Sequence, residues 1–517
     1  MLRFALPLFL LSSAYAATPA LMPLPVTFTA GAGKLVIDNT FKAALVSPPD
    51  ARLNAAIVRT VAQISARTGI PMLGLKASPA KLRVECARPG NEHPTLGEDE
   101  SYTLNVTPEG ATLVAATRAG ALHGLATIAQ LVTLGKDGFE IAATHIEDKP
   151  RFPWRGLMID SARHWMPVPV IKRNLDAMAA VKLNVFHWHL SEDQGFRVES
   201  LRYPKLHLEG SDGLYYTQAE VREIVAYARD RGIRVVPEFD IPGHTAAWVV
   251  GYPELGTNPG PNEIGRHWGI YENALDPSRE ETYTFLDGFF EEMTALFPDP
   301  YFHIGGDEVL DKQWKESARV QAFAKEHNLK DAHAIQAYFN QRVQKLLVKR
   351  GKILIGWDEV LHPDLPQDIV VQSWRGQKSL AEAATKGYRG ILSWGYYMDH
   401  LSPASLHYGV DPMSGDADKL TPEQAARILG GEMCMWAEYV TSETVDSRIW
   451  PRGAVVAERL WSPAATRDVD SMYTRMEAVS RQLEFTGVQH RANYAPMLER
   501  MAGGRPVEAL RVLADAL

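Results

Sequence analysis

Two adjacent carboxylic acids, Asp307 and Glu308, directly follow an apolar run and a pair of glycines, Gly305 and Gly306. Because successive residues of a strand point to opposite sides, both acids reach one cavity only if the strand ends before them. The two glycines permit the tight turn that this requires. A carboxylic acid with a raised pKa can protonate a glycosidic oxygen, so the pair is a candidate for acid–base hydrolysis of a sugar linkage.

Polar and aromatic residues also stand at the ends of other apolar runs of strand length. A sugar pocket needs this mixture, because aromatic faces pack against the C–H face of a sugar ring while carboxylates, Arg and His bind its hydroxyls. A random distribution of such residues would not select strand ends. The residues at or just beyond the other strand ends are Arg163, Glu192, Asp193, Glu238, Asp240, His244, Trp357, Asp358, Glu359, Trp374, Tyr396, Tyr397, Asp399, Trp436 and Glu438.

The adjacency of the two acids favours one division of labour. An ordinary retaining glycosidase places its acid and its nucleophile about 5 Å apart on opposite sides of the scissile bond, which two neighbours on one strand do poorly. We therefore expect Glu308 to be the general acid and base, and Asp307 to orient a group of the substrate. On a sugar with a 2-acetamido group, the carbonyl oxygen can attack C1 while Asp307 holds the amide N–H.

The elements that must position these residues are eight apolar runs. They are Trp154–Asp160, Leu183–Leu190, Arg234–Asp240, Tyr301–Glu308, Lys352–Glu359, Ile369–Trp374, Gly390–Tyr397 and Ile428–Glu438. Helical patterns lie between most of them, at Val168–Val181, Thr217–Arg231, Ser278–Phe297 and Ala332–Arg350. Eight buried strands alternating with helices predict an α/β fold, a (β/α)8 TIM barrel with its active site at the strand C-termini. The short connection between Trp374 and Gly390 shows no clear helix, and Trp450–Trp461 is the candidate start of the eighth.

The chain before the barrel has a different rhythm. Residues 18–150 alternate short β-like runs, at 34–37, 81–86, 102–106 and 112–115, with helical stretches at 51–68 and 119–134. This mixture predicts a small α+β domain, and it contains no cluster of catalytic residue types. Pro150 and Pro153 mark a boundary. We expect the catalytic barrel at 151–490 and a helical tail at 491–517.

The first residues have the pattern of a secretory signal peptide. Met1–Arg3 is a cationic start, Phe4–Leu11 is mostly apolar, and Ala14-Tyr15-Ala16 is an A-x-A cleavage pattern. The apolar run is too short for a membrane span, and no later run qualifies. We expect residues 1–16 to be removed and the mature protein to be exported, to the periplasm or the extracellular space.

Composition excludes several classes of protein. The chain has 517 residues, of which 46% are hydrophobic, and this is ordinary globular usage. The net charge of −8 provides no basic field for nucleic acid. Two cysteines, Cys86 and Cys434, exclude a disulfide scaffold and a thiolate zinc cluster.

Several segments together resemble one enzyme family. His303-x-Gly305-Gly306-Asp307-Glu308 is similar to the signature of the β-N-acetylhexosaminidases of glycoside hydrolase family 20, which include chitobiase-like bacterial enzymes. The resemblance extends in order along the barrel from about Arg151 to Trp461, and the front domain resembles the small domain that precedes the barrel in many members. The other matching segments are 160–164, 183–193, 238–244, Trp357, 374–375, Tyr397, 435–438 and 458–461.

The resemblance implies a function and a set of roles. Terminal β-linked N-acetylglucosamine or N-acetylgalactosamine would be removed from oligosaccharides or glycoconjugates by substrate-assisted retaining hydrolysis, with no metal or cofactor. Many members have Asp where this sequence has Glu192. The implied roles are the proton donor Glu308; the acetamido-holding Asp307 and Tyr397; the supporting pair Glu192 and His244; the wall residues Trp357, Trp374 and Trp436; and the hydroxyl-binding Arg163, Asp399 and Glu438.

Two other functions remain open. His187, His189, His244 and Asp307 suggest a metal-dependent barrel hydrolase, which would need three or more ligands that converge. The same aromatic rim would also suit a non-catalytic sugar-binding protein. For single residues we expect His187 and His189 to be structural and Cys434 to be a buried, inert thiol. The positions of Trp165, Trp188 and Trp248 fit either a core or a pocket.

Overall fold

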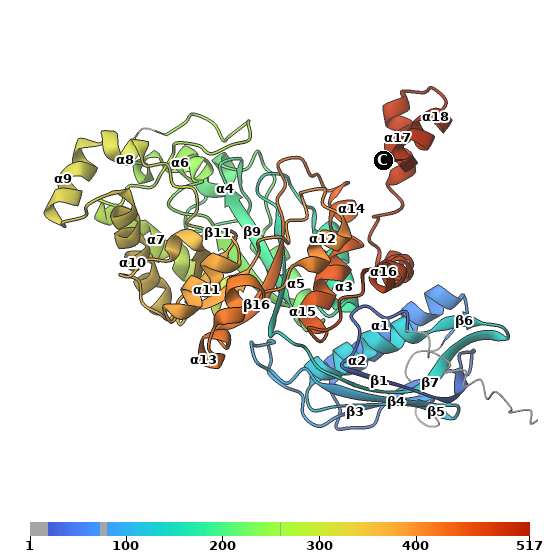
Figure 1. Ribbon diagram of the computed structural model, residues 1–517. Helices are drawn as coiled ribbons and strands as arrows, with labels where there is room; N and C mark the ends of the chain where they lie inside the picture. Colours follow the sequence, from blue (N-terminus) through green and yellow to red (C-terminus); the bar gives the residue numbers. More distant parts are fainter. Residues whose placement is uncertain (1–18, 73–79, 259, 517) are drawn as a thin grey trace, which may run out of the picture.

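The computed structural model describes residues 19–72, 80–258 and 260–516, so the predicted signal peptide, residues 1–16, lies outside the described residues. A small front domain packs against a larger barrel, and the last two helices extend away from the barrel (Figure 1). Within the described ranges, none of the helices has the length and hydropathy of a membrane-spanning segment.

The front domain is a mixed sheet with two helices on the face toward the barrel (Figure 1). Its strands are ordered β1-β7-β4-β5-β3-β2, and β6 pairs with β7. They are β1 (Thr27–Val36), β2 (Ala43–Leu45), β3 (Leu82–Cys86), β4 (Tyr102–Thr107), β5 (Gly110–Ala115), β6 (Thr133–Gly135) and β7 (Gly138–Asp148). The predicted α+β class is confirmed, but the sequence patterns missed β7, the long strand that pairs with both β1 and β4.

Both helices of the front domain begin at a side-chain cap. The carboxylate of Asp50 accepts the Leu53 N–H at the start of α1 (Ala51–Thr68), and Gly69 ends this helix in the left-handed conformation. The hydroxyl of Thr117 starts α2 (Arg118–Leu131) in the same way. Ser, Thr, Asp and Asn are favoured at such positions because they satisfy a free backbone donor.

Eight parallel strands close the barrel in chain order, and this confirms the predicted TIM-barrel class. They are β8 (Trp154–Asp160), β9 (Val185–Glu192), β11 (Arg234–Phe239), β12 (Tyr301–His303), β13 (Ile353–Trp357), β14 (Val370–Ser373), β15 (Arg389–Leu392) and β16 (Ile428–Met435). The short β10 (Gly195–Phe196) pairs antiparallel with β9. Each strand lies in or overlaps one predicted run, but most end earlier than the run, and the remaining residues of those runs belong to the loops beyond the strands.

The helices around the barrel are less regular than the strands. The four predicted helices are α3 (Val168–Ala180), α5 (Gln218–Arg229), α7 (Glu280–Leu296) and α10 (Ala332–Val348). The short connection after β14 contains α11 (Gln377–Thr385), which the sequence patterns did not identify. The eighth helix is α15 (Arg452–Trp461), and α16 (Val469–Leu483) follows it. Shorter helices are α4 (Lys205–Glu209), α6 (Ala246–Gly251), α8 (Lys312–Glu316), α9 (Ala318–Glu326), α12 (Ala404–Gly409), α13 (Pro422–Ala425), α14 (Val445–Ile449) and the 3₁₀ turns η1 (Pro253–Leu255), η2 (Asp358–Val360), η3 (Gly415–Lys419) and η4 (Glu484–Thr486).

The barrel interior changes character from bottom to top. One side chain from each strand forms the apolar layer Trp154, Val185, Val236, Tyr301, Ile355, Val370, Ile391 and Leu429. Nearer the strand C-termini the interior is polar. The buried polar side chains there are His187, His189, Glu238, His303, Gln372 and Glu432. Most TIM-barrel interiors are filled by branched apolar residues, so a polar layer is unusual and lies directly under the expected site.

A buried ionic cluster joins the front domain to the barrel. Arg155 of β8 donates to the carboxylate of Glu100, which also accepts from His123 of α2. Lys182, just after α3, lies 2.8 Å from Asp148 of β7. The indole of Trp461 donates to the other oxygen of Asp148 and packs within the apolar core of the front domain.

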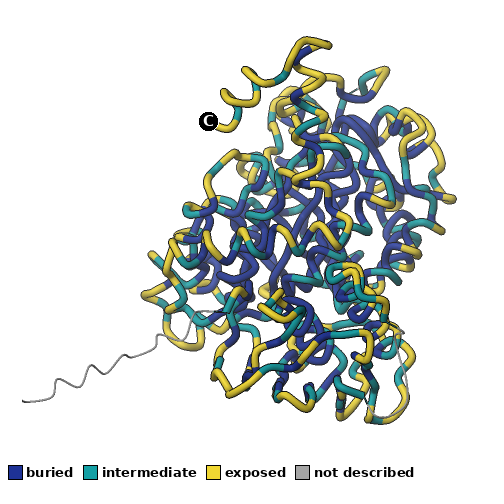
Figure 2. The backbone as a smooth tube through the Cα atoms, turned by 90° about the vertical axis from the view of Figure 1, so that its right-hand side faces the viewer, coloured by how far each residue is buried: buried dark blue, intermediate teal, exposed yellow. Residues whose placement is uncertain are grey.

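The chain ends in an extended helical pair. α17 (Tyr494–Ala502) and α18 (Glu508–Ala516) project from the body, and α18 has no buried residue. Figure 2 shows this exposed end and the buried interior of the barrel and front sheet.

Candidate active site

The turn after β12 brings both acids of the sequence motif to one cavity. The strand ends at His303, and Gly305 and Gly306 follow with φ of 66° and 91°. A Cβ at Gly305 would lie 1.9 Å from a carboxylate oxygen of Asp240, so only glycine fits there. Glu308 itself has a φ of 48°. This tight turn is what lets two neighbouring side chains reach the same space.

The cavity has a volume of about 730 Å³ and lies at the C-terminal ends of the strands. Nine of the predicted site residues line it: Arg163, Asp307, Glu308, Trp357, Trp374, Tyr397, Asp399, Trp436 and Glu438. The two others, Glu192 and His244, are 1% and 3% exposed and lie beneath its surface. The structure therefore brings all eleven predicted residues to one place.

Sequence reasoning missed part of the lining. Six residues that follow β14 and β15 were not assigned: Arg375, Trp394, Gly395, His400, Ser402 and His407. Trp394 is 47% exposed and offers an open aromatic face. Arg375 directly follows the predicted run that ends at Trp374, and this signal would have identified it. Trp394 lies inside the predicted run Gly390–Tyr397, and His407 comes from a helix, α12, so neither had such a signal.

Tryptophans form the apolar part of the cavity. Trp357 and Trp436 lie with ring centroids 5.7 Å apart. The indole of Trp357 donates to Glu238 over 2.9 Å, and that of Trp374 donates to Glu359 over 3.2 Å, so each ring is held at its polar edge. Such fixed rings can pack against the C–H face of a sugar.

The structure also places Cys434 and the three tryptophans that the sequence left unassigned. Cys434 packs against Trp357 beneath the cavity, and burial raises the pKa of its thiol, as expected of an inert cysteine. Trp188 and Trp248 are fully buried core residues. Trp165 is half-buried against the ring of Tyr216.

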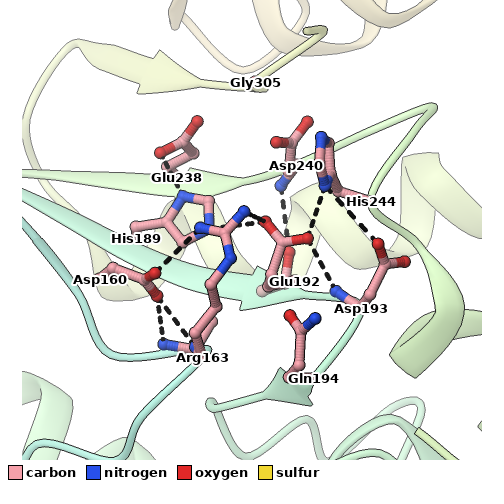
Figure 3. Close-up of polar contacts among 12 residues, drawn as sticks. Asp160, Arg163, His189, Glu192, Asp193, Gln194, Glu238, Asp240, His244 and Gly305 are labelled. Carbon is pink, nitrogen blue, oxygen red and sulfur yellow. Dashed lines mark hydrogen bonds and ion pairs between the residues drawn. The ribbon is translucent and has the colours of Figure 1, made fainter. Parts of the chain in front are cut away.

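Arg163 is held by three carboxylates, two of which, Asp160 and Glu192, are shown in Figure 3. Its guanidinium lies 3.0 Å from Asp160, 3.1 Å from Glu192 and 3.7 Å from Glu438. Burial alone would lower the pKa of Arg163, but these acids outweigh it and raise that pKa well above the usual range. The result is a permanent cation with donors left for a ligand oxygen.

Glu192 joins Arg163 to His244. One of its oxygens lies 2.6 Å from His244 Nδ1, and the other faces Arg163. Despite burial, Arg163 and His244 hold the pKa of Glu192 well below its usual value, and Glu192 in turn raises that of His244 well above. His244 Nε2 lies 3.6 Å from Glu308 and 3.9 Å from Asp307. A buried imidazolium therefore faces both acids.

Two carboxyl groups in or beside the cavity have pKa values raised toward neutrality. Burial raises the pKa of Asp399 to about 6, with Glu438 adding to the shift and His400 opposing it. Burial and the proximity of Asp307 raise the pKa of Glu359 to about 7. Burial also raises the pKa of Asp307, while His244 opposes that shift. Such perturbed groups gathered in one cavity are typical of an active site.

The interior histidines have protein partners, in agreement with the structural role expected for them. His187 lies between Glu238 at 3.1 Å and Glu432 at 2.7 Å, and these acids raise its pKa to about 9 against the effect of burial. His189 lies between Glu238 and Glu192, with a pKa raised to about 10.

The ligand set of the metal-hydrolase hypothesis does not converge. Three groups of described residues have geometry that suits a metal: His187, Glu238 and His303; Glu192, Asp193 and His244; and Asp240, His244 and Asp307. None of these groups contains His187 or His189 together with His244. The third group contains His244 and Asp307 of the hypothetical ligand set, with Asp240 in place of His187 and His189.

Comparison with known proteins agrees with this geometry. The model of glycosyl hydrolase family 20, catalytic domain, matches residues 152–464, and that of family 20, domain 2, matches residues 18–149. The chain belongs to glycosyl hydrolase family 20. The enzyme class predicted from the sequence, β-N-acetylhexosaminidase, is thereby confirmed: members of this family are glycosidases that act on terminal N-acetylhexosamine.

Individual relatives cover most of the chain. The beta-hexosaminidase subunit alpha of Bos taurus is 39% identical over 415 residues, which is 77% of each chain. The structure is similar to that of Flavobacterium johnsoniae chitobiase, with a TM-score of 0.92 and 44% identity, over 96% of this chain and 77% of that one. It is also similar to the exo-β-N-acetylglucosaminidase of Vibrio harveyi in complex with N-acetylglucosamine, with a TM-score of 0.80 and 27% identity, over 92% and 79%.

Proposed function

We propose that the enzyme removes terminal, non-reducing β-linked N-acetylglucosamine or N-acetylgalactosamine with retention of configuration, using the substrate's acetamido group as the nucleophile. The observation that carries this proposal is the shared turn of Asp307 and Glu308, whose side chains both line the cavity. Neighbours on one turn are poorly placed to act as acid and nucleophile across a scissile bond. They are well placed to serve the leaving oxygen and the acetamido group.

In the first step, the carbonyl oxygen of the acetamido group bonds to C1 while the bond from C1 to the leaving oxygen breaks. Glu308 transfers its proton to that leaving oxygen. The product is an oxazolinium ion whose N–H carries positive charge, and Asp307 accepts this N–H. In the second step, water attacks C1, its proton passes to Glu308, and the oxazolinium ring opens to restore the acetamide.

The remaining residues hold the sugar. Trp357, Trp374 and Trp436 enclose the ring and the acetamido methyl, and the hydroxyl of Tyr397 donates to the acetamido oxygen. Arg163, Asp399 and Glu438 bind the ring hydroxyls. Glu192 and His244 support Glu308, since the His244 imidazolium favours the charged form of the acid after proton transfer. Glu192 reaches both Arg163 and His244, so the Glu at this position, where many relatives have Asp, serves two cations.

A paired assay tests the mechanism. An aryl N-acetyl-β-glucosaminide is expected to be cleaved, and the matching plain β-glucoside, which lacks the nucleophile, essentially not. Equal rates on the two substrates would refute substrate assistance. Proton NMR of the first sugar released is expected to show the β-anomer, and an initial α-anomer would refute retention. The same assay on an N-acetylgalactosaminide and on chitobiose defines the substrate range, and binding without turnover would favour the sugar-binding alternative.

We also propose that the enzyme is exported and cut after Ala16. The support is the cationic, apolar and A-x-A pattern of the first residues. Expression of the full chain in a bacterial host, followed by N-terminal sequencing of the exported protein, is expected to give a mature start at Ala17. Full-length protein retained in the cytoplasm would contradict the proposal.

A further inference from the structure

Asp240 is a buried acid beneath the catalytic turn that the mechanism above does not use. It directly follows β11 and is 1% exposed. Its backbone N–H donates to Ser191 Oγ over 3.0 Å, and its Oδ1 accepts the N–H of Gly306 over 3.0 Å. Figure 3 shows Asp240 beside His244. The carboxyl group therefore ties the end of β11 to the turn that carries Asp307.

One oxygen of Asp240 is left without a partner. Oδ2 is buried and makes no hydrogen bond to any described residue. Oδ1 of Asp307 is in the same condition. The two carboxyl groups and His244 each place an atom within 4.8 Å of the others. A proton on Asp240 would let one of these two carboxyl groups donate to the other, whereas two ionised carboxylates at this distance would repel each other.

The charged groups around Asp240 decide which acid keeps the proton. Glu238 on β11, Glu192 on β9 and Asp307 after β12 are acids, and they add to burial in raising the pKa of Asp240 well above its usual value. His244 opposes them, but its Nδ1 is already engaged by Glu192. Burial raises the pKa of Asp307 as well, but His244 and a side-chain hydrogen bond with Asp240 both oppose that shift.

We propose that Asp240 is a positioning residue that stays protonated and donates its Oδ2–H to Asp307, which keeps Asp307 ionised and aimed at the acetamido N–H. What Asp307 does to the substrate rests on the proposed function, whereas the proton on Asp240 does not. The arrangement explains how several acids can lie close together beneath the cavity. The charge of Glu192 is balanced by His244, and the charge of Asp307 is stabilised by a hydrogen bond from the neutral Asp240. It also explains why Gly305 has no room for a side chain, since Asp240 occupies that space.

Two variants separate a neutral acid from a carboxylate. In Asp240→Asn, the amide keeps one acceptor for Gly306 and provides N–H donors for Asp307, so kcat on the N-acetyl substrate is expected to fall by less than tenfold. In Asp240→Ala both bonds are lost, Asp307 is free to move, and kcat is expected to fall by about 10²-fold with a smaller change in KM. If Asp240→Asn is as damaging as Asp240→Ala, Asp240 acts as a carboxylate and the proposal is wrong.

The pH profile gives a readout that a merely structural role would not move. Without the donated hydrogen bond, the pKa of Asp307 rises, so the acid limb of kcat/KM is expected to shift to higher pH in Asp240→Ala. The limb in Asp240→Asn is expected to stay near that of the wild type. An unshifted limb in Asp240→Ala would contradict a role that acts through Asp307.

Difference infrared spectroscopy tests the proton directly and does not depend on activity. Subtracting Asp240→Asn from the wild type at pH 7 is expected to show a carbonyl band of a protonated carboxylic acid. Glu100→Gln is the matched control, because Glu100 is a buried acid whose pKa is held at about 2 by Arg155 and His123 against burial, and its difference spectrum should show a carboxylate band. A carboxylate band for Asp240 would overturn the proposal.

Two further outcomes are distinguishable. If Asp240, His244 and Asp307 hold a metal, the activity will be lost on chelation with EDTA and restored by Zn²⁺, and the proposal fails. If the wild type ignores the N-acetyl group, the proposed function fails, while the infrared result still decides whether Asp240 carries a proton.

Discussion

Two clusters of buried charge in this enzyme are built in opposite ways. The interface cluster joins the front domain to the barrel and comprises Glu100, His123, Asp148, Arg155 and Lys182. The site cluster lies under the cavity and comprises Arg163, Glu192, Asp240, His244 and Asp307. Both remove acids and bases from water, and both draw their members from distant parts of the chain.

The two clusters differ in how many of their buried polar atoms lack a hydrogen-bond partner. In the interface cluster, every buried side-chain nitrogen and oxygen of the five described residues has a hydrogen-bond partner. In the site cluster, Asp240 Oδ2, His244 Nε2 and Asp307 Oδ1 have none within the described chain. An unsatisfied buried polar atom costs about 1–3 kcal/mol, so complete pairing is typical of a structural cluster and incomplete pairing of one that reserves its contacts for a ligand. The comparison predicts that changes in the first affect stability and changes in the second affect turnover.

The largest effect is expected from Glu308→Gln, next to the site cluster. Loss of the proton donor should lower kcat by about 10²- to 10⁴-fold on substrates with poor leaving groups, and far less on activated aryl glycosides that need little acid assistance. Steady-state kinetics over a series of leaving groups measures this. Glu316→Gln, at an exposed glutamate on α8, is the control. It should change neither the dependence of kcat on the leaving group nor the melting temperature. An unchanged leaving-group dependence in Glu308→Gln would place the acid elsewhere.

A substitution that breaks the interface cluster should lower stability and leave turnover nearly unchanged. Lys182→Met leaves Asp148 with an uncompensated buried charge, which is expected to cost about 3–5 kcal/mol of unfolding free energy. The kcat of the folded protein should stay within twofold, because the cluster does not contact the cavity. Denaturant unfolding followed by kinetics measures both quantities. Lys34→Met, at a surface pair with Glu140, is the control and should cost less than about 1 kcal/mol. A Lys182→Met variant that is stable but inactive would contradict the structural role assigned to the interface cluster.

Asp307→Asn tests whether a residue of the site cluster contributes to turnover rather than to stability. Loss of the charge that meets the oxazolinium N–H should lower kcat by about 10²-fold rather than merely raise KM. Since the variant also removes a buried negative charge from beside Asp240 and Glu238, the melting temperature should rise or stay the same. Calorimetry beside steady-state kinetics checks this trade of activity for stability. A lower melting temperature would show that Asp307 is a structural residue.

The smallest effect is a pH dependence of stability that differs between Glu100, in the interface cluster, and His189, which lies next to the site cluster. Arg155 and His123 outweigh burial and hold the pKa of Glu100 at about 2, below its ordinary 4.5. Its stabilisation is therefore complete above pH 4.5 and is lost as the pH falls, by about 2 kcal/mol at pH 3. The pKa of His189, which pairs with Glu192 under the site, is raised to about 10, so its stabilisation is complete below pH 6.5 and is lost as the pH rises toward 10.

Unfolding free energies of the wild type and Glu100→Gln from pH 3 to pH 10 measure both limbs. The variant should lack the acid limb and keep the alkaline one. An acid limb that persists unchanged in Glu100→Gln would assign it to other carboxylates.

The barrel and most of its cavity were predictable from the sequence because their signals are local. Buried parallel strands appear as apolar runs, and each run ends in a polar or aromatic residue, so the ends alone identified Trp357, Trp374 and the Asp307–Glu308 pair. Where local signals are weak, prediction failed. β7 alternates only partly between buried and exposed residues, and α11 is short and has no side-chain cap at its start.

The two charge clusters were not predictable as clusters, because pairing across the fold has no local pattern. Glu100 and Arg155 are distant in the chain, and nothing around either residue indicates the other. Asp240 was visible as a strand-end acid, but its protonation depends on groups from β9, β11 and the turn after β12 acting together. His407 reaches the cavity from α12, which follows no strand end directly.

Trp461 has a consequence for how the chain is made. This residue closes α15 at the far end of the barrel, yet its ring is part of the front domain's apolar core and its N–H bonds to Asp148. During translation the front domain therefore leaves the ribosome first but lacks a piece of its own interior until most of the barrel has been synthesised. The first domain to emerge is therefore among the last to have its core completed.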